Sequence, residues 1–475
     1  KGSVVALVAP IVAAWFIRVL ERPEHHWPSR IRGLLPQAAV AAITSLVAFF
    51  AFEPYALLRP LVYVQSLRTQ ADIVSGAFDV PFTRVFSGTT PGLYQVEQLV
   101  RWGLGPVAGL LALGGLVWLG HEVWRRQPVA VILASWLVAY SAVLATAEVK
   151  FLRYLEPLTP VFAICAAGAL LWLMNRLQLR CSPRWGTALL AATLGLSFLW
   201  TASFTSIYAR ENPRIAATKW IYAEIPPGSS LTAEYWDDAL PRSLTYALNP
   251  AAYGLGTINF DLYRDLPPAE ATNAIADVLE RADYVVQSSL RVEAGVRAEP
   301  WRYPAQIRYY DALAAGEIGF SRVAQFASWP GAGPLHIDDR AADESFINYD
   351  HPLVSIYQKD RPFDRARFDA AIAWAENQPW QPSRWQSDPT LLLPTPVGEN
   401  PAVSDARWSA ALTSATPGAV AVWVGLLLAL LATGLPWSRL AFAAFPDQGW
   451  GLARILGFVL PAYIVWIAAC LHLAR

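Results

Sequence analysis

The chain has 475 residues, of which 55% are hydrophobic and only 16% are charged, and its mean hydropathy is +0.31. This composition excludes an ordinary soluble enzyme, yet it is too mild for a chain embedded in lipid from end to end. Aromatic residues at 12% and a formal net charge of zero also exclude a disordered chain and a nucleic-acid-binding protein. We therefore expect a membrane protein that includes a water-soluble part.

The balanced charge hides two regions of opposite sign. Residues 208–416 contain 18 Lys or Arg against 27 Asp or Glu, so the rest of the chain carries the compensating positive charge. The cysteines Cys165, Cys181 and Cys470 lie outside this acidic region, which excludes an internal disulfide and a cysteine-based zinc site there. Because Lys1 is not an initiator methionine and Arg475 ends an apolar stretch, we expect an excerpt of a longer protein.

Eight stretches are long and apolar enough to form membrane helices. They cover approximately residues 3–20, 34–52, 102–120, 129–147, 159–175, 186–206, 418–437 and 450–472. Arginines concentrate in the connections after the first, third, fifth and seventh stretches, and cytoplasmic loops are the ones that retain positive charge. The alternation therefore places residues 53–101, residues 148–158 and the acidic region outside the cytoplasm.

The acidic region alternates strand and helix patterns separated by Pro and Gly, which predicts an α/β domain. The predicted strands are 230–236, 256–260, 283–288, 320–326 and 353–358. The predicted helices are 213–224, 268–281, 304–315 and 364–376. The expected fold is a polytopic α-helical membrane protein of about eight transmembrane helices, with membrane domains at residues 1–208 and 417–475 and an inserted external α/β domain at residues 209–416.

The short external connection at residues 148–158 carries two cations, Lys150 and Arg153, where the positive-inside tendency disfavours them. A phosphate at the membrane surface would compensate for them, because Lys supplies a point charge and Arg a two-pronged donor. Alternatively, Glu148 and Glu156 simply balance the two cations. Both interpretations remain open on the residues alone.

The connection at residues 53–101 is too long for a plain connector, and long loops are often functional. Arg84, Tyr94 and Glu97 within it are candidates for lining a cavity. A segment that anchors the helices at the membrane interface explains them equally well. The membrane stretches themselves hold almost no ionisable groups, which disfavours a transporter.

Three short clusters in the acidic region have the residue types that bind cations. They are Trp236-Asp237-Asp238, His336-Ile-Asp338-Asp339 and Asp350-His351. Such residues more often cap turns or helices. We therefore expect no metal and no cofactor.

The segment from Lys150 to Pro160, KFLRYLEPLTP, resembles a K/R-F-x-R-Y-x-x-P-x-x-P pattern of lipid-carrier-dependent glycosyltransferases. These are the protein O-mannosyltransferase-like and aminoarabinose-transferase-like membrane enzymes of the GT-C class. Residues 87–106 and 217–238 are similar to bacterial members, and the resemblance covers most of residues 34–360. Separately, residues 445–451, with Tyr463 and Trp466, resemble the opening of YYY-domain polytopic membrane proteins.

The first resemblance implies transfer of a sugar from a polyprenyl-phosphate donor to an acceptor on the outer face of the membrane, by an inverting displacement. It implies that Lys150 and Arg153, with Tyr154 beside them, bind the donor phosphate. The family's general base is an acidic residue in the first external loop, which would precede residue 1. The catalytic residue therefore stays unassigned, and the role of general base is given neither to Glu148 nor to Glu97.

The rival hypothesis is a non-catalytic membrane subunit or scaffold of a larger envelope or energy-transducing complex. The expected partners are the lipid bilayer, a polyprenyl-phosphate-linked sugar and other membrane subunits, with no nucleic acid. The expected location is the plasma membrane, with residues 209–416 on the extracytoplasmic side.

Overall fold

The computed structural model describes residues 2–21, 26–180, 182–245, 248–332, 335–383, 416–470 and 473. It divides into two compact units, one of residues 1–43 with 61–388 and one of residues 44–60 with 389–475. Among the described residues, seven helical segments are long and apolar enough to cross a membrane, the pattern of a multi-pass membrane protein. These segments are Trp27–Phe52, Pro106–Trp124, Pro128–Ala145, Leu152–Leu179, Pro183–Glu224, Pro417–Ala441 and Trp450–Cys470.

The eighth expected span, residues 3–20, falls short of this length. It forms η1 (Gly2–Leu7) and α1 (Val8–Leu20), and its continuous apolar helix covers only Val5–Leu20. A helix rises 1.5 Å per residue, so these residues are shorter than the roughly 30 Å thickness of the hydrocarbon core. Within the part of the chain that the structure describes, seven of the about eight expected spans are thus long enough, and the first is a shorter apolar helix.

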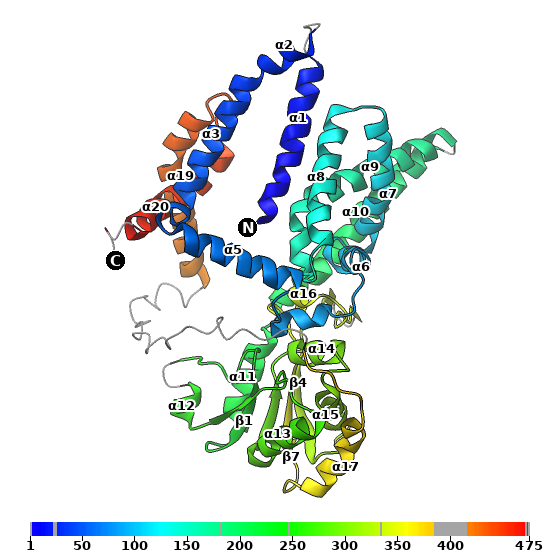
Figure 1. The fold of residues 1–475 in the computed structure, drawn as a ribbon, viewed down its shortest axis with the longest axis vertical. Helices are drawn as coiled ribbons and strands as arrows, with labels where there is room; N and C mark the ends of the chain where they lie inside the picture. Colours follow the sequence, from blue (N-terminus) through cyan, green and yellow to red (C-terminus); the bar gives the residue numbers. More distant parts are fainter. Residues whose placement is uncertain are drawn as a thin grey trace. The chain divides into compact units, whose positions relative to one another are not determined.

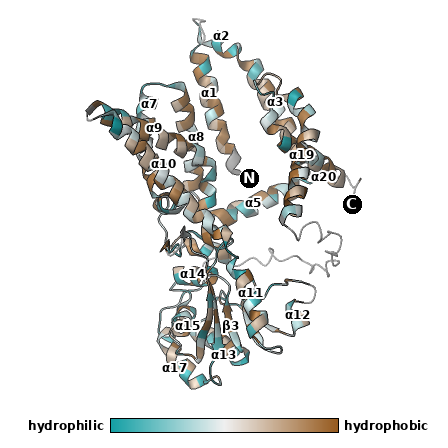
Figure 2. Cartoon of the chain, turned by 180° about the vertical axis from the view of Figure 1, so that it is seen from behind, coloured by the Kyte–Doolittle hydropathy of each residue, from teal (hydrophilic) through white to brown (hydrophobic). Residues whose placement is uncertain are grey.

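Four apolar helices of the first unit pack together: α7 (Pro106–Trp124), α8 (Pro128–Ala145), α9 (Thr159–Arg180) and α10 (Pro183–Thr205). Figure 2 shows the mostly apolar colouring of this group beside the more polar α/β domain. Glycine permits the close approach of α7 and α9, because a Cβ on Gly115 would lie 1.9 Å from the carbonyl oxygen of Cys165. Small residues at such contacts are typical of helix pairs in membranes.

The segments between these helices are themselves largely helical. The predicted long connection at residues 53–101 contains α4 (Tyr55–Leu58), α5 (Pro60–Ser75), the 3₁₀ helix η2 (Pro81–Phe86) and α6 (Leu93–Gln98). It continues into a π-helical turn, η3 (Leu99–Gly103). The connection between α8 and α9 contains the 3₁₀ helix η4 (Leu152–Leu158). The remaining helices before α7 are α2 (Trp27–Arg32) and α3 (Leu35–Phe52).

The second unit contains a tightly packed helix pair, α19 (Thr416–Ala441) and α20 (Ala453–Cys470). A Cβ on Gly434 would lie 1.7 Å from the oxygen of Ala453, so the two backbones are in contact. The short η8 (Trp450–Leu452) leads into α20. The Tyr463 ring of α20 packs against Phe52, with 4.8 Å between the ring centroids.

A five-stranded mixed sheet forms the centre of the α/β domain, in the order β2-β1-β3-β7-β4 (Figure 1). Its strands are β1 (Ser230–Glu234), β2 (Gly256–Phe260), β3 (Tyr284–Gln287), β4 (Phe320–Phe326) and β7 (Val354–Lys359). β1 pairs in parallel with β2 and β3, whereas β7 runs antiparallel to β3 and β4. The carboxyl ends of β1, β2 and β3 therefore meet at one edge.

Helices cover both faces of this sheet, because successive strand residues point to opposite sides. Val285 packs on one face with α13 (Pro268–Arg281), α15 (Pro304–Ala314) and α17 (Arg365–Glu376). Tyr284 and Val286 pack on the other face with α11 (Pro213–Glu224). The domain thus has three layers around two apolar cores.

The structure contains all five predicted strands and all four predicted helices of the α/β domain. The sequence analysis did not identify the short elements α12 (Pro250–Tyr253), α14 (Arg291–Ala298), α16 (Glu344–Ile347), β5 (Gly331–Ala332) and β6 (Leu335–His336). Helices of four to eight residues and strands of two residues show too few periods of an apolar pattern to be recognised.

The contact between α7 and α9 can be tested with two adjacent glycines. Gly115→Val should destabilise the helix group by about 1–3 kcal/mol, because the new side chain meets the backbone of Cys165. Gly114→Val is the matched control, since a Cβ there meets no atom within 4 Å. Thermal unfolding of both variants, followed by size-exclusion of the folded fraction, measures the difference. Equal melting temperatures for the two variants would contradict the close contact.

Candidate functional site

The two connecting segments, residues 76–105 before α7 and residues 146–158 before α9, both contact the α/β domain. The Asp343 carboxylate accepts hydrogen bonds from the Tyr94 hydroxyl at 2.9 Å and from the Leu152 backbone N–H at 3.1 Å. Gln98 bonds to the same loop on both sides, accepting from the Asp343 N–H at 2.8 Å and donating to the Ala341 carbonyl at 3.2 Å. Segments that the arginine alternation assigned to one side of the membrane therefore lie together.

A second contact joins η2 to the α/β domain through buried charges. Arg84 binds the Asp79 carboxylate with two hydrogen bonds of 2.9 Å, and its Nη1 donates to the Tyr303 hydroxyl at 2.5 Å. Arg302 of the domain binds the same carboxylate at 2.9 Å. The side chains of Asp79, Arg84 and Arg302 are each less than one-tenth exposed.

The pKa values of Asp79 and Tyr303 shift in opposite directions, although the two guanidinium groups act to lower both. Burial alone would raise the pKa of Asp79, but the hydrogen bonds and charge of Arg84, together with Arg302, hold it below its ordinary value. Burial raises the pKa of Tyr303, outweighing the opposing effect of the two guanidinium groups. Asp79 therefore stays ionised and Tyr303 stays neutral, as an ionic cluster in a poorly hydrated contact requires.

Of the three candidates for a cavity loop, two belong to these contacts and one does not. Arg84 is fully engaged with Asp79 and Tyr303, and Tyr94 donates to Asp343. Burial and the nearby Asp343 carboxylate raise the pKa of Tyr94, so its hydroxyl remains a donor. Glu97 instead forms a half-exposed pair with Arg101 one helical turn away. The side chains of these three residues thus take part in three separate contacts.

The two cations of the segment before α9 occupy different surroundings. The Lys150 ammonium is fully buried, donating to the Glu148 carbonyl at 2.8 Å and lying 3.6 Å from the Glu148 carboxylate. Arg153 is exposed, and its guanidinium lies over the Phe151 ring, 4.4 Å from the centroid, and 5.8 Å from that of Tyr154. Among the described residues Arg153 has no carboxylate partner. Lys150 is thus bound inside its own segment, whereas the charge of Arg153 is exposed.

The three clusters considered for metal binding do not assemble into a metal site. Asp237 is buried and accepts from Arg214 at 3.1 Å, while Asp338 pairs with Arg340. Asp339 and His351 come together in a buried pair, with 2.6 Å between Oδ2 and Nε2. Within the described ranges no three His, Cys, Asp or Glu side chains gather in a way that suits a metal ion.

At the carboxyl edge of the parallel strands, the sequence analysis identified Trp236, Asp237 and Asp238 but not Glu234. The Glu234 side chain, at the end of β1, is fully enclosed and accepts from the Tyr310 hydroxyl at 2.8 Å, whereas its Oε2 has no partner. Burial raises the pKa of Glu234 well above its ordinary value, with the Tyr310 bond opposing this. Trp236 follows with a left-handed φ of +75°, a strained conformation often found at functional sites. The signal that could have located Glu234 is its position near the end of the predicted strand 230–236.

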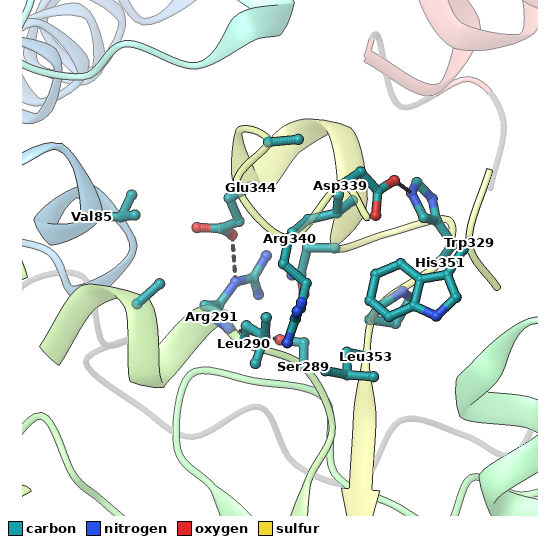
Figure 3. A pocket seen from close by; sticks show the side chains of 15 residues that line it. Val85, Ser289, Leu290, Arg291, Trp329, Asp339, Arg340, Glu344, His351 and Leu353 are labelled. Atoms are coloured by element: carbon teal, nitrogen blue, oxygen red, sulfur yellow. Dashed lines mark hydrogen bonds and ion pairs between the residues drawn. The ribbon is translucent and has the colours of Figure 1, made fainter. Parts of the chain in front are cut away.

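A cavity of about 100 Å³ lies next to this edge, between the end of β3 and the loop that leads to β7 (Figure 3). Its wall includes Arg291, whose Nε donates to Glu344 at 2.5 Å, and the Asp339–His351 pair. Burial raises the pKa of Glu344, opposed by the charge of Arg291. The cavity contains none of the residues that the sequence analysis proposed for donor binding.

The comparisons with known proteins do not assign this chain to a family. Comparison with models of protein families, with curated proteins and with solved structures finds no match. The resemblance to GT-C glycosyltransferases therefore depends only on the residues quoted for it.

The ionic cluster can be tested at Asp79. Asp79→Asn should cost about 3 kcal/mol, because it leaves the buried guanidinium of Arg84 without its charge partner and removes one of the three carboxylate partners of Arg302. Hydrogen–deuterium exchange at residues 79–86 and 299–305 should become faster. Glu97→Gln is the control and should cost less than about 0.5 kcal/mol, because the Glu97–Arg101 pair is half-exposed. Unchanged exchange in Asp79→Asn would contradict the proposed role of the cluster.

The raised pKa of Glu234 predicts a pH-dependent contribution to stability. The folded state binds this proton more tightly than the unfolded state, so the contribution is fully present below the unfolded pKa of about 4.3 and is lost as pH rises through the folded value. Glu234→Gln should therefore raise the melting temperature at pH 8 and change it little at pH 5. Melting curves of both proteins at the two pH values measure this. An equal shift at both values would contradict a neutral Glu234.

Proposed function

We propose that the protein is a multi-pass membrane glycosyltransferase-like protein that binds a polyprenyl-phosphate-linked sugar on the extracytoplasmic side of the plasma membrane, with Arg153 as the donor-phosphate ligand. The observation that carries this proposal is the state of Arg153. It is an exposed cation directly before an apolar helix, and among the described residues it has no carboxylate partner. An anion would supply the missing counter-charge.

The surroundings of Arg153 suit a phosphate at a membrane surface. The rings of Phe151 and Tyr154 hold the guanidinium by cation–π contacts, which limits its movement without neutralising its charge. Its two-pronged geometry matches the oxygens of a phosphate. The π-helical turn η3 lies beside it, since a Cβ on Gly103 would be 3.2 Å from Leu152, and such turns frequently occur at functional sites.

Lys150 and Tyr154 have supporting roles in this proposal. Lys150 stabilises the segment before α9, because its buried ammonium binds Glu148. The backbone N–H of Glu148 in turn donates to the carbonyl of Val74 at the end of α5. Tyr154 accepts a hydrogen bond from the Tyr140 hydroxyl of α8 through its carbonyl. The general base of the transfer is not assigned to any residue of this chain.

The second candidate is a non-catalytic membrane subunit or scaffold. This candidate is favoured because the side chains of Arg84, Tyr94 and Lys150 all form hydrogen bonds within the protein. In that case the connecting segments serve to hold the α/β domain and Arg153 has no lipid ligand.

Binding of undecaprenyl phosphate to the purified full-length protein distinguishes the two candidates. Arg153→Ala should weaken binding roughly ten- to a hundredfold, because it removes a charged hydrogen-bonding partner worth about 1.5–3 kcal/mol. Arg153→Lys should recover only part of the affinity, since the two-pronged geometry is lost. Arg68→Ala, at another exposed arginine, controls for general attraction of an anionic lipid and should bind like the unaltered protein. Equal affinity in all four proteins would leave the scaffold as the better account.

A further inference from the structure

The cavity at the carboxyl edge of the sheet has a wall of mixed character. One part is apolar and includes Leu290, Ile347 and Leu353, with the half-buried indole of Trp329. The other part carries charged and polar side chains from α14, α16 and the loop around residue 340 (Figure 3). In α/β folds, ligands commonly bind outside the carboxyl ends of parallel strands, which is where this cavity lies.

The charged and ionisable side chains around the cavity already have partners. Arg291 binds Glu344 at 2.5 Å, and His351 binds Asp339 at 2.6 Å. Arg340 is held by Asp338 through Nε at 2.9 Å. An anionic ligand would therefore meet the carboxylates of Glu344 and Asp339, and a cationic ligand would meet two guanidinium groups. Either kind of ligand would have to displace the existing partner of one of these side chains.

Both hydrogen-bond donors and acceptors remain available in this wall. A guanidinium has five N–H donors and a carboxylate about four acceptor positions, so the pairs leave capacity on each side. The Nδ1 of His351 is buried without a hydrogen-bond partner, although the residue lines the cavity. Buried polar atoms normally have a hydrogen-bond partner, and leaving such a bond unmade costs free energy. A ligand hydroxyl that reached this nitrogen could pair with it in either tautomer, because a hydroxyl both donates and accepts.

We propose that this cavity binds an uncharged polyhydroxy compound of about the size of one sugar ring. Hydroxyl groups would use the spare donors and acceptors, and the C–H face of the ring would lie against Trp329 and the apolar wall. The volume of about 100 Å³ is well below the roughly 300–1,000 Å³ of pockets that enclose drug-sized ligands, so the site has room for no more than one such ring. Arg153 does not line the cavity, and the proposal is independent of phosphate binding there.

The test uses the full-length protein in phosphatidylcholine nanodiscs, which avoids detergents that carry sugar headgroups. Saturation-transfer NMR would be recorded with methyl α-D-glucoside, methyl α-D-mannoside, N-acetylglucosamine and myo-inositol, and with inorganic phosphate as the charged comparison. At least one of the four neutral compounds should bind saturably, and phosphate should not compete with it. Saturable binding of phosphate in its place, or of none of the four below roughly 50 mM, would overturn the proposal.

Two pairs of variants assign the binding to this cavity. Trp329→Ala should weaken it about tenfold, whereas Trp301→Ala, at another partly exposed tryptophan of the domain, should leave it unchanged. Arg340→Met should also weaken binding, and it keeps the fold because the arginine is on the surface. Arg361→Met is its matched control, since Arg361 likewise pairs with a neighbouring carboxylate, Asp360, but lies outside the cavity. Binding unaffected by both Trp329→Ala and Arg340→Met would place the site elsewhere and overturn the proposal.

Discussion

The hydrogen bonds that converge on Asp343 determine how the soluble part of the first unit meets its membrane helices. A carboxylate that accepts from Tyr94 of one connecting segment and from the Leu152 N–H of the other links both to a single loop of the α/β domain. The Asp79–Arg84–Arg302 cluster adds a second attachment, between η2 and the α/β domain. Because charged groups bonded in poorly hydrated contacts are costly to separate, these two attachments favour one arrangement of segments and domain.

This attachment explains why neighbouring cations have different roles. The segment from Glu148 to Leu158 is hydrogen-bonded both to α5 and to the loop of Asp343. In this position Lys150 is buried and Arg153 is exposed. A buried ammonium requires partners, and Lys150 finds them in its own segment. Arg153 keeps its charge available, held by two aromatic rings. A positive charge of this kind at the start of an apolar helix is the basis of the proposed lipid-phosphate site.

The sequence predicted the regular elements well and the site poorly, for physical reasons. The strand from Phe320 to Phe326 and the helix from Pro268 to Arg281 were recognised because several periods of their apolar pattern lie within one stretch of chain. The pairing of Asp79 with Arg302 joins residues more than two hundred positions apart, and no local pattern records it. The burial of Lys150 was also missed, although its partner Glu148, two residues away, was considered. Of the His and Asp clusters, only Asp339 and His351 meet, because the domain fold brings their loops together.

The most direct test of the central claim is to map where a polyprenyl phosphate binds. A photoreactive undecaprenyl-phosphate analogue, with its reactive group in the isoprene unit next to the phosphate, would be cross-linked to the full-length protein and the labelled peptides sequenced. The account predicts labelling within residues 150–158 and 99–106, where η4 and the π-helical turn lie side by side, and its loss in Arg153→Ala. Labelling spread evenly over the apolar helices, or unchanged by Arg153→Ala, would contradict it.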